Sequence, residues 1–500
     1  MSLHAELTSE AIERLRIQRR NSTISSLVIA VLTIVLIGLA LGFVFLNPLI
    51  KESPTIVTYQ SNLNEETQLE DRKVQTNFER KPSSPTSSMA KVITASTTSN
   101  VAIPVTDVDV PAPSLDFGDG DDFGSGWGDG AGEGGGFASI PPVMKKRCSK
   151  ADRLQRLQET GGTPECEEAV LKALRWMKTT QSADGSWNGG IKNHAAMTGL
   201  ALLAYLGHCE TPLSEEFGDT VLKAITYLVN LGMKQKGKLA SAMGEGHWPY
   251  EHAIATYALA ESTTFCKQLN IPVPNLEEVT QMAGQFIIDN QHRKTGAWDY
   301  SYDVRGDRGG DTSVTAWHVQ ALKACEHTGL KFRNMNSTKS KAADYIEAAQ
   351  NANGGFGYRS KNEKRPYLTM TGGCVLSLQM MGRDSSAMVR RGVEYISENT
   401  RFNYTGKESD LYGHYYEAQA MMNRGGSDWK KYNAIFRDQL LKNQAANGTW
   451  PKPNNGNAKT QRAVAGASQM NNNPHYRTCL NTLMLEVYYR FLPGTTSKSE

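Results

Sequence analysis

Apolar positions in the last two thirds of the chain alternate between two kinds of stretch. In the first kind, such as Ala169–Met177, apolar residues recur every three or four positions, which is the pattern of a helix with one buried face. In the second kind, such as Met197–Leu206, nearly every residue is apolar or small, which indicates a helix buried on all sides. The pattern therefore predicts pairs of helices, each an outer amphipathic helix followed by an inner buried one.

A short phrase joins the two helices of a pair: a glutamine, a glycine turn and then an aromatic residue. The copies start at Gln181, Gln291, Gln350 and Gln444 and end at Trp187, Trp298, Phe356 and Trp450. A degenerate copy without glutamine runs from Gly244 to Trp248, and Phe402–Tyr404 stands where one more turn is due. Because internal repeats indicate architecture more strongly than local propensity does, we expect six pairs of helices.

Six pairs between Gly161 and Pro493 predict an all-α domain, residues 148–495, with the architecture of an α/α toroid, a double-walled barrel of six helical hairpins. Closure is expected because an open stack would leave the inner helices exposed at both ends. An open superhelix of the HEAT or TPR kind is the alternative. The consistent difference in polarity between the two helix types favours the closed barrel.

Residues 24–46 form a run of 23 residues without a charged side chain. As a helix this run would span about 34 Å, enough for a hydrocarbon core of about 30 Å. Arginines precede the run, so the positive-inside rule places residues 1–23 in the cytoplasm and the rest of the chain outside. We therefore predict a single-pass anchor in the inner (plasma) membrane with a periplasmic domain. A cleaved signal peptide is the alternative, although the run is long for one and lacks small residues at its exit.

Residues 47–147 are predicted to be a disordered linker, rich first in Pro, Ser and Thr and then in Gly and Asp. From Gly118 to Gly136, ten of nineteen residues are glycine, interleaved with acidic residues. This alternation resembles calcium loops, but the EF-hand spacing and nonapeptide repeats are missing, so a flexible acidic tether is favoured. As a flexible coil the linker would reach about 55 Å.

Charge and cysteine content exclude several classes of protein. The chain has 54 basic and 51 acidic residues, a net charge of +3, and no basic patch with interleaved aromatic residues, so no nucleic-acid partner is predicted. The seven cysteines include no CxxC pair that would indicate a zinc ribbon or a redox motif. Cys148 and Cys166 stand outside the helical pattern and are a candidate disulfide in an oxidising compartment. The others are interpreted as small core residues: Cys209, Cys266, Cys325, Cys374 and Cys479.

The phrase Q-x3-G-x-W followed by a buried helix resembles the repeat of squalene and hopene cyclases and, more loosely, that of protein prenyltransferase β subunits. With its N-terminal anchor, its Gly-rich tether and an ending such as Leu485–Phe491, the chain is similar to bacterial exported proteins described as prenyltransferase/squalene oxidase repeat proteins. The resemblance covers about two thirds of the chain and implies the α/α toroid with a central cavity at one end. It does not by itself imply the chemistry.

The cyclases protonate an alkene with an Asp from a D-x-D-D-T motif at the start of an inner helix. The matching place here is Arg308–Thr312, in which Asp311 and Thr312 fit the motif. Gly310, however, stands where the proton donor should be, and Arg308 stands where its partner carboxylate should be. The resemblance therefore does not predict cyclase activity by this mechanism.

Protein prenyltransferases hold Zn²⁺ with Asp, Cys and His. Their Asp-x-Cys would fall near Asp410–His414, where no Cys occurs, and Arg477 stands where their His is expected. The Cys-Gly-Glu-Gln phrase of complement-like thioester domains, which share the toroid, is also missing from the sequence. We predict neither a metal nor a cofactor.

Polar residues where a turn meets its inner helix remain as candidates for chemistry. Asp303, Asp307 and Asp311 recur at a spacing of four and are candidate catalytic residues, because paired carboxylates do acid and base work in glycosidases on helical barrels. The alternative is that Asp311 caps the following helix and the others are solvated loop residues. Candidates for binding in the cavity are His247, Tyr250, His252, Trp298, His318 and His414. The alternative for the histidines is a structural role with satisfied hydrogen bonds.

Three functions stay open at this point. The preferred one is an exported toroid that binds an apolar or peptide ligand in its central cavity without turning it over, because both sets of family catalytic residues are broken. The second is a divergent terpenoid cyclase-like or carboxylate-dependent enzyme. The third is a scaffold whose tether lets the toroid meet an envelope protein. Standard squalene/hopene cyclase and zinc prenyltransferase activities are not expected, and whether the chain is an enzyme is left open.

Overall fold

The computed structural model describes residues 147–490, except 189, 242, 245, 362–367, 454–469 and 471. The chain divides into two compact units, Met1–Thr106 and Asp107–Glu500, and every described residue belongs to the second. The predicted membrane helix, residues 24–46, and nearly all of the predicted linker lie outside the described residues. Within the described part, the search for a helix of sufficient length and hydropathy to cross a bilayer finds none.

The described chain forms the expected alternation of outer and inner helices. The outer helices are α4 (Pro164–Thr179), α6 (Gly218–Lys234), α8 (Leu276–Asp289), α10 (Met335–Ala348), α12 (Ala387–Asn399) and α14 (Gly426–Asn443). The inner helices are α5 (His194–Gly207), α7 (Trp248–Gln268), α9 (Thr312–His327), α11 (Leu368–Met380), α13 (Leu411–Arg424) and α16 (Pro474–Leu485). Apart from a first or last residue, the inner helices are buried almost throughout, whereas each outer helix buries one face.

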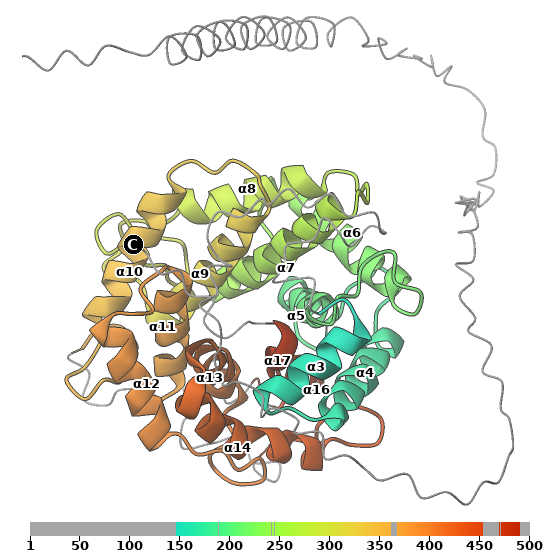
Figure 1. Cartoon of the computed structure of the whole chain (residues 1–500). Coiled ribbons are helices and arrows are strands. Elements are labelled where there is room, and N and C mark those ends of the chain that lie inside the picture. The colour runs from blue at the N-terminus through green and yellow to red at the C-terminus, as the bar shows by residue number, and fades with distance from the viewer. Residues whose placement is uncertain are drawn as a thin grey trace, which may run out of the picture. The chain divides into compact units, whose positions relative to one another are not determined.

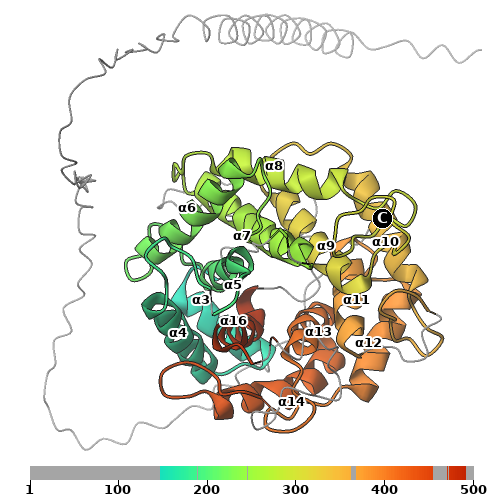
Figure 2. The same ribbon diagram turned by 180° about the vertical axis from the view of Figure 1, so that it is seen from behind.

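The inner helices close into a ring. Each of them packs against the next in chain order, from α5 through α7, α9, α11 and α13 to α16, and α16 packs back against α5. Figures 1 and 2 show this inner ring surrounded by the outer helices. The predicted α/α toroid is therefore confirmed, and the open superhelix is excluded.

The repeated glutamine fastens each turn to the neighbouring outer helix. In all four copies its Nε2 donates to the carbonyl of the turn glycine and to a backbone carbonyl of the next outer helix, at 2.8 to 3.1 Å. The carbonyls on the outer helices belong to Thr220 in α6, Thr338 in α10, Met388 in α12 and Ala169 in α4. Because Gln444 of the last repeat reaches α4 of the first, the same hydrogen bonds also join the two ends of the ring.

The turn aromatic and glycine are fixed by packing rather than by a ligand. The indole Nε1 of Trp298 donates to Ile287 O of the preceding outer helix at 2.9 Å, and Trp187 and Trp450 make the equivalent bond. Gly296 has a φ of +79°, and a Cβ placed on it would lie 2.6 Å from Lys341 O in α10. Only glycine fits this backbone without strain.

Two turns lack the glutamine of the repeated phrase. Trp248, the aromatic of the degenerate copy, is the first residue of α7 instead of lying in the turn, and Gly244 and Gly246 have open space around them. The turn predicted at Phe402–Tyr404 is confirmed, since it joins α12 to α13, and Tyr404 is buried. The degenerate copy at Gly244–Trp248 therefore forms a looser turn than the other copies.

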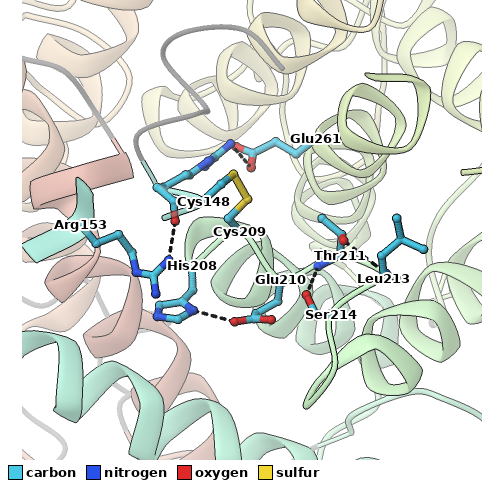
Figure 3. Close-up of a disulfide and its surroundings, with 10 residues drawn as sticks. Cys148, Arg153, His208, Cys209, Glu210, Thr211, Leu213, Ser214 and Glu261 are labelled. Atoms are coloured by element: carbon cyan, nitrogen blue, oxygen red, sulfur yellow. Dashed lines mark hydrogen bonds and ion pairs between the residues drawn. A yellow bond between two sulfur atoms is a disulfide. The ribbon is translucent and has the colours of Figure 1, made fainter. Parts of the chain in front are cut away.

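Two helices outside the six pairs lie at the end of the ring where the inner helices finish. They are α3 (Lys150–Thr160) and α17 (Val487–Arg490), and they pack against each other. Cys148, just before α3, forms a disulfide with Cys209, just after α5 (Figure 3). The predicted pairing of Cys148 with Cys166 is wrong, because Cys166 is a buried free thiol within α4. Cys209 is buried in the core as predicted, but it is bonded to Cys148. We call the end of the ring that carries α3, α17 and the Cys148–Cys209 disulfide the closed end of the toroid.

Candidate functional site

The opposite end of the ring, where the inner helices begin, is the mouth of the toroid. Side chains from the starts of three inner helices meet there: Tyr250 of α7 shares a hydrogen bond with Ser313 of α9, and the Tyr412 hydroxyl of α13 donates to Ser313 O at 3.3 Å. The N-terminal ends of these three inner helices therefore meet at the mouth.

Asp311 is the N-cap of α9 and lies at the mouth, at the centre of a group of hydrogen-bonded side chains. Its Oδ1 accepts hydrogen bonds from Val314 N at 2.9 Å and from Ser313 Oγ at 2.7 Å. The first is the bond that an N-cap side chain makes with an otherwise unsatisfied helix donor. The capping interpretation of Asp311 is therefore confirmed.

Capping occupies only one oxygen of Asp311. The other, Oδ2, accepts from Arg308 Nη2 at 3.0 Å and from the Tyr358 hydroxyl at 3.3 Å. Arg308 Nη2 also donates to the Tyr358 hydroxyl at 3.0 Å, and the hydroxyls of Tyr358 and Tyr300 are hydrogen-bonded. Two chains of hydrogen-bonded hydroxyl groups thus start at the carboxyl group of Asp311, one from each oxygen. We call the set the aspartate–tyrosine cluster: Tyr250, Tyr300, Arg308, Asp311, Ser313 and Tyr358.

Burial sets the charge state of the cluster. Asp311 has an exposed fraction of 0%, and this burial raises its pKa above the ordinary value, although the hydrogen bonds and the ion pair that it accepts oppose the shift. Burial likewise raises the pKa of Tyr300 and, more strongly, that of Tyr250. The Arg308 guanidinium lies 4.3 Å from the centre of the Tyr300 ring, a cation–π contact. Tyr250 and Tyr300 therefore present neutral hydroxyls beside the Arg308–Asp311 salt bridge.

The other predicted catalytic residues do not join Asp311. Asp303 and Asp307 are exposed, and Asp303 Oδ1 accepts from Arg305 N within its own loop at 3.0 Å. Among the described residues, neither carboxyl group is hydrogen-bonded or ion-paired to Asp311. The structure thus brings one of the three predicted carboxylates into the cluster, and a catalytic role for any of them stays a prediction.

Three of the predicted cavity histidines are built into the packing between helices. His318 Nδ1 donates to Val314 O at 2.8 Å, so its Nε2 accepts from the Tyr302 hydroxyl, at 2.6 Å. His252 accepts from Leu239 N at 3.0 Å through Nδ1. Burial lowers the pKa of His252 and of His318 to about 3, so both rings are neutral.

His414 and Trp298 also have structural partners. His414 Nε2 donates to Glu408 O, and its Nδ1 shares a hydrogen bond with the Tyr432 hydroxyl, both at 3.1 Å. Trp298 is almost completely buried, and its indole stacks on His318 with the ring centres 4.9 Å apart. These hydrogen bonds and contacts indicate a structural role for His414 and Trp298.

Two of the predicted cavity residues lie at the mouth. Tyr250 belongs to the cluster, and the exposed His247 ring meets the Tyr300 ring edge-on, with the centres 4.1 Å apart. Sequence reasoning missed Tyr300 and Tyr358. A signal was present, because each follows a turn aromatic by two positions, as Tyr250 does: Trp298-Asp-Tyr300, Phe356-Gly-Tyr358 and Trp248-Pro-Tyr250.

Two surface pockets accompany these features. One, of about 320 Å³, adjoins the cluster through Arg308, and its other lining residues are Thr295, Gly309, Gly310, Tyr345, Arg359 and Ser360. The second, of about 400 Å³, lies between α4 and α14, where the first and last repeats meet. In the described part of the chain, no three His, Cys, Asp or Glu side chains are grouped so that they could hold a metal ion.

Comparison with known proteins gives structural likeness alone. No family model matches the sequence, and no curated protein matches it. The chain is similar in structure to the type II terpene cyclase MstE from Scytonema, with 11% identity, a TM-score of 0.41, and coverage of 65% of this chain and 98% of that chain. A variant of that enzyme bound to merosterolic acid A gives a TM-score of 0.40 at 11% identity, covering 65% of this chain and 97% of that chain.

Proposed function

We propose that the toroid binds an apolar or peptide ligand at its mouth, with the aspartate–tyrosine cluster as the recognition surface. The observation that supports this most strongly is the convergence on Asp311 of side chains from three successive turns and their inner helices. Helix capping needs only one carboxylate oxygen, so the contacts of Arg308 and Tyr358 with Oδ2 are additional to it.

The chemistry of the cluster suits a ligand with apolar surface and a few polar groups. Tyrosine supplies a large apolar ring and a hydroxyl at little cost in conformational entropy, which is why it recurs in binding surfaces. Asp311 itself is fully buried, so a ligand would contact the tyrosines and Arg308 while the carboxyl group holds them in place. Binding without turnover fits the glycine at position 310, where the resemblance to cyclases would require the acid.

An enzyme is the second candidate, supported by a specific feature. Asp311 combines a pKa raised by burial with two hydroxyl chains that lead from it to Tyr250 and Tyr300. A carboxyl group of raised pKa that is connected to hydroxyls can deliver a proton at a distance. In this case Asp311→Asn would abolish conversion of a ligand, while the variant would still bind the ligand more weakly than the wild type does.

Binding can be tested with two probes, geranylgeraniol and a blocked tetrapeptide of leucine and phenylalanine, titrated into the chain while its tryptophan and tyrosine fluorescence is followed. Tyr358→Phe removes one hydroxyl from the cluster and is expected to weaken binding of the accepted probe by about tenfold, the value of one hydrogen bond of about 1.4 kcal/mol. Tyr227→Phe, whose hydroxyl contacts Ser241 and no residue of the cluster, is the matched control and should bind normally. Binding of neither probe, or equal binding by both variants, would contradict the proposal; mass spectrometry of the recovered probe separates binding from conversion.

We further propose that residues 24–46 anchor the chain in the inner membrane and that residues 47–146 tether the toroid outside, where an envelope protein could also be its partner. The apolar run, the preceding arginines and the acidic glycine-rich segment support this.

The expected result is digestion of the toroid by protease added to spheroplasts, with the first residues protected. A toroid protected until the spheroplasts are lysed would contradict the predicted orientation, and cross-linking of intact envelopes that captures no protein would count against a scaffold role.

A further inference from the structure

The chain enters the toroid through a charged residue that is buried at the closed end. Arg147 has an exposed fraction of 2%, and its guanidinium lies 3.5 Å from Glu261 Oε2 and 5.0 Å from the centre of the Phe265 ring. Both contacts are in the last part of α7, far along the helix from Tyr250 at the mouth. A carboxylate beside an aromatic face is the environment that a guanidinium group prefers.

The contacts of Arg147 belong to a defined group of side chains, which we call the arginine seat: Tyr257, Glu261, Phe265, Glu486 and Arg490. Arg490 donates to Glu261 Oε1 and to the Tyr257 hydroxyl, each at 3.0 Å. Glu261 therefore keeps Arg490 as a partner when Arg147 leaves. Its other oxygen, Oε2, faces the position that the Arg147 guanidinium occupies.

Further bonds hold the segment that carries Arg147 across the closed end. Arg153 Nη1 donates to Arg147 O at 2.7 Å, and Arg153 Nε donates to Glu167 Oε1 at 2.8 Å. His208, at the end of α5, bridges Glu167 at 3.1 Å and Glu210 at 2.8 Å. Figure 3 shows Arg153, His208 and Glu210 around the disulfide, which joins the same segment to the end of α5.

Seating Arg147 carries a cost that these bonds offset only in part. Burial lowers the pKa of Arg147. Within the described residues, Arg147 Nε and both carboxyl oxygens of the fully buried Glu486 have no hydrogen-bond partner. Each such buried polar atom costs about 1–3 kcal/mol. A disulfide that closes a loop of 61 residues contributes about 4 kcal/mol to the free energy of unfolding, which is similar in size to the cost of these unsatisfied atoms.

We infer that the closed end is a guanidinium-binding site, filled by Arg147 of the same chain, and that the Cys148–Cys209 disulfide controls its occupancy. A dithiol reductant transfers two electrons and two protons to the disulfide, giving the two cysteine thiols, while the reductant becomes a disulfide. The segment 147–160 then leaves the closed end, and the seat accepts a guanidinium group from another molecule. The site is separate from the mouth and does not depend on the function proposed there.

The first test compares the oxidised full-length chain with its Cys148→Ser, Cys209→Ser variant by hydrogen–deuterium exchange. Exchange in α3 is expected to be at least tenfold faster in the variant, with exchange in α9 unchanged, and trypsin is expected to cut after Arg147 only in the variant. Cys166→Ser, which alters a buried thiol outside the disulfide, is the control and should behave as the wild type. Equal exchange in α3 would overturn the control by the disulfide. If the variant does not fold, wild-type protein reduced with dithiothreitol gives the same comparison.

The second test asks what the empty seat binds. Adding Arg147→Ala to the double serine variant removes the occupant, and 10 mM methylguanidinium is expected to raise the melting temperature of this variant above that in 10 mM methylammonium, on the order of 2 °C for a millimolar site. The oxidised wild type should show no such difference, because Arg147 fills the seat. Adding Glu261→Gln should abolish the difference. Equal melting temperatures in the two salts for the variant that retains Glu261 would overturn the guanidinium site.

Discussion

Replacing His252 and His318 by glutamine is expected to flatten the loss of stability that the domain shows as the pH falls from 6 to 4. Burial holds the pKa of both rings at about 3 in the folded chain, far below the usual value of 6.5. The unfolded chain therefore takes up two protons below pH 6.5 that the folded chain refuses until about pH 3. Stability from these groups is present above pH 6.5 and is lost as the pH falls.

The size of the effect follows from the two shifts. Each refused proton costs about 1.4 kcal/mol per pH unit. Over two pH units the two histidines lower the free energy of unfolding of the wild type by up to about 5 kcal/mol, and the variant has no such loss. The variant is expected to be less stable at pH 7, because the stacking of His318 on Trp298 is lost, and the deficit should shrink as the pH falls. Urea unfolding at pH 7, 6, 5 and 4 measures it.

Glu486 provides a control of opposite sign. Burial raises its pKa well above the ordinary value, so the folded chain keeps a proton that the unfolded chain releases above about pH 4.5. Its contribution to stability is present at acid pH and is lost as the pH rises. Glu486→Gln is therefore expected to gain stability relative to the wild type between pH 5 and pH 8. A histidine variant whose deficit is the same at every pH would show that burial does not keep His252 and His318 neutral.

The architecture of the toroid could be predicted because its information is local and repeated. Each Gln-Gly-aromatic phrase specifies one turn, and the polarity of the two flanking stretches separates outer from inner helices. Closure followed from the same pattern, and Gln444 shows why: it makes with α4 the bonds that Gln181 makes with α6. The turn at Trp248 was mispredicted, because Trp248 and Pro249 begin α7 instead of ending the turn.

The candidate site could be predicted only in part, because it is assembled between repeats. Asp311 and Tyr250 stand at helix starts that the pattern identifies, whereas Tyr300 and Tyr358 approach them only after neighbouring turns pack side by side. The pairing of Cys148 was mispredicted for a similar reason. Cys166 is the nearer cysteine in sequence, but the segment before α3 crosses the closed end to reach Cys209. His318 and His414 were read as cavity residues because their backbone and tyrosine partners are set by tertiary contacts.

The most decisive test of the repeat mechanism compares two glycines that have the same backbone φ. Gly296 and Gly190 both have a φ of +79°, but a Cβ on Gly296 would lie 2.6 Å from Lys341 O, whereas a Cβ on Gly190 would have nothing within 4 Å. Gly190→Ala therefore carries only the cost of left-handed backbone, about 1 kcal/mol. Gly296→Ala adds overpacking against α10, and we expect a total loss of about 3–4 kcal/mol in the free energy of unfolding.

The consequence of Gly296→Ala should also be local to one seam of the ring. Moving the turn away from α10 would break the bonds from Gln291 Nε2 to Gly296 O and Thr338 O, both 2.8 Å. Urea unfolding gives the total loss, and hydrogen exchange is expected to rise first in α10 and in the turn that carries Trp298. Equal losses for the alanine variants of Gly296 and Gly190 would mean that the close approach of turn and outer helix contributes nothing, and that the glycine recurs in the phrase only for its positive φ.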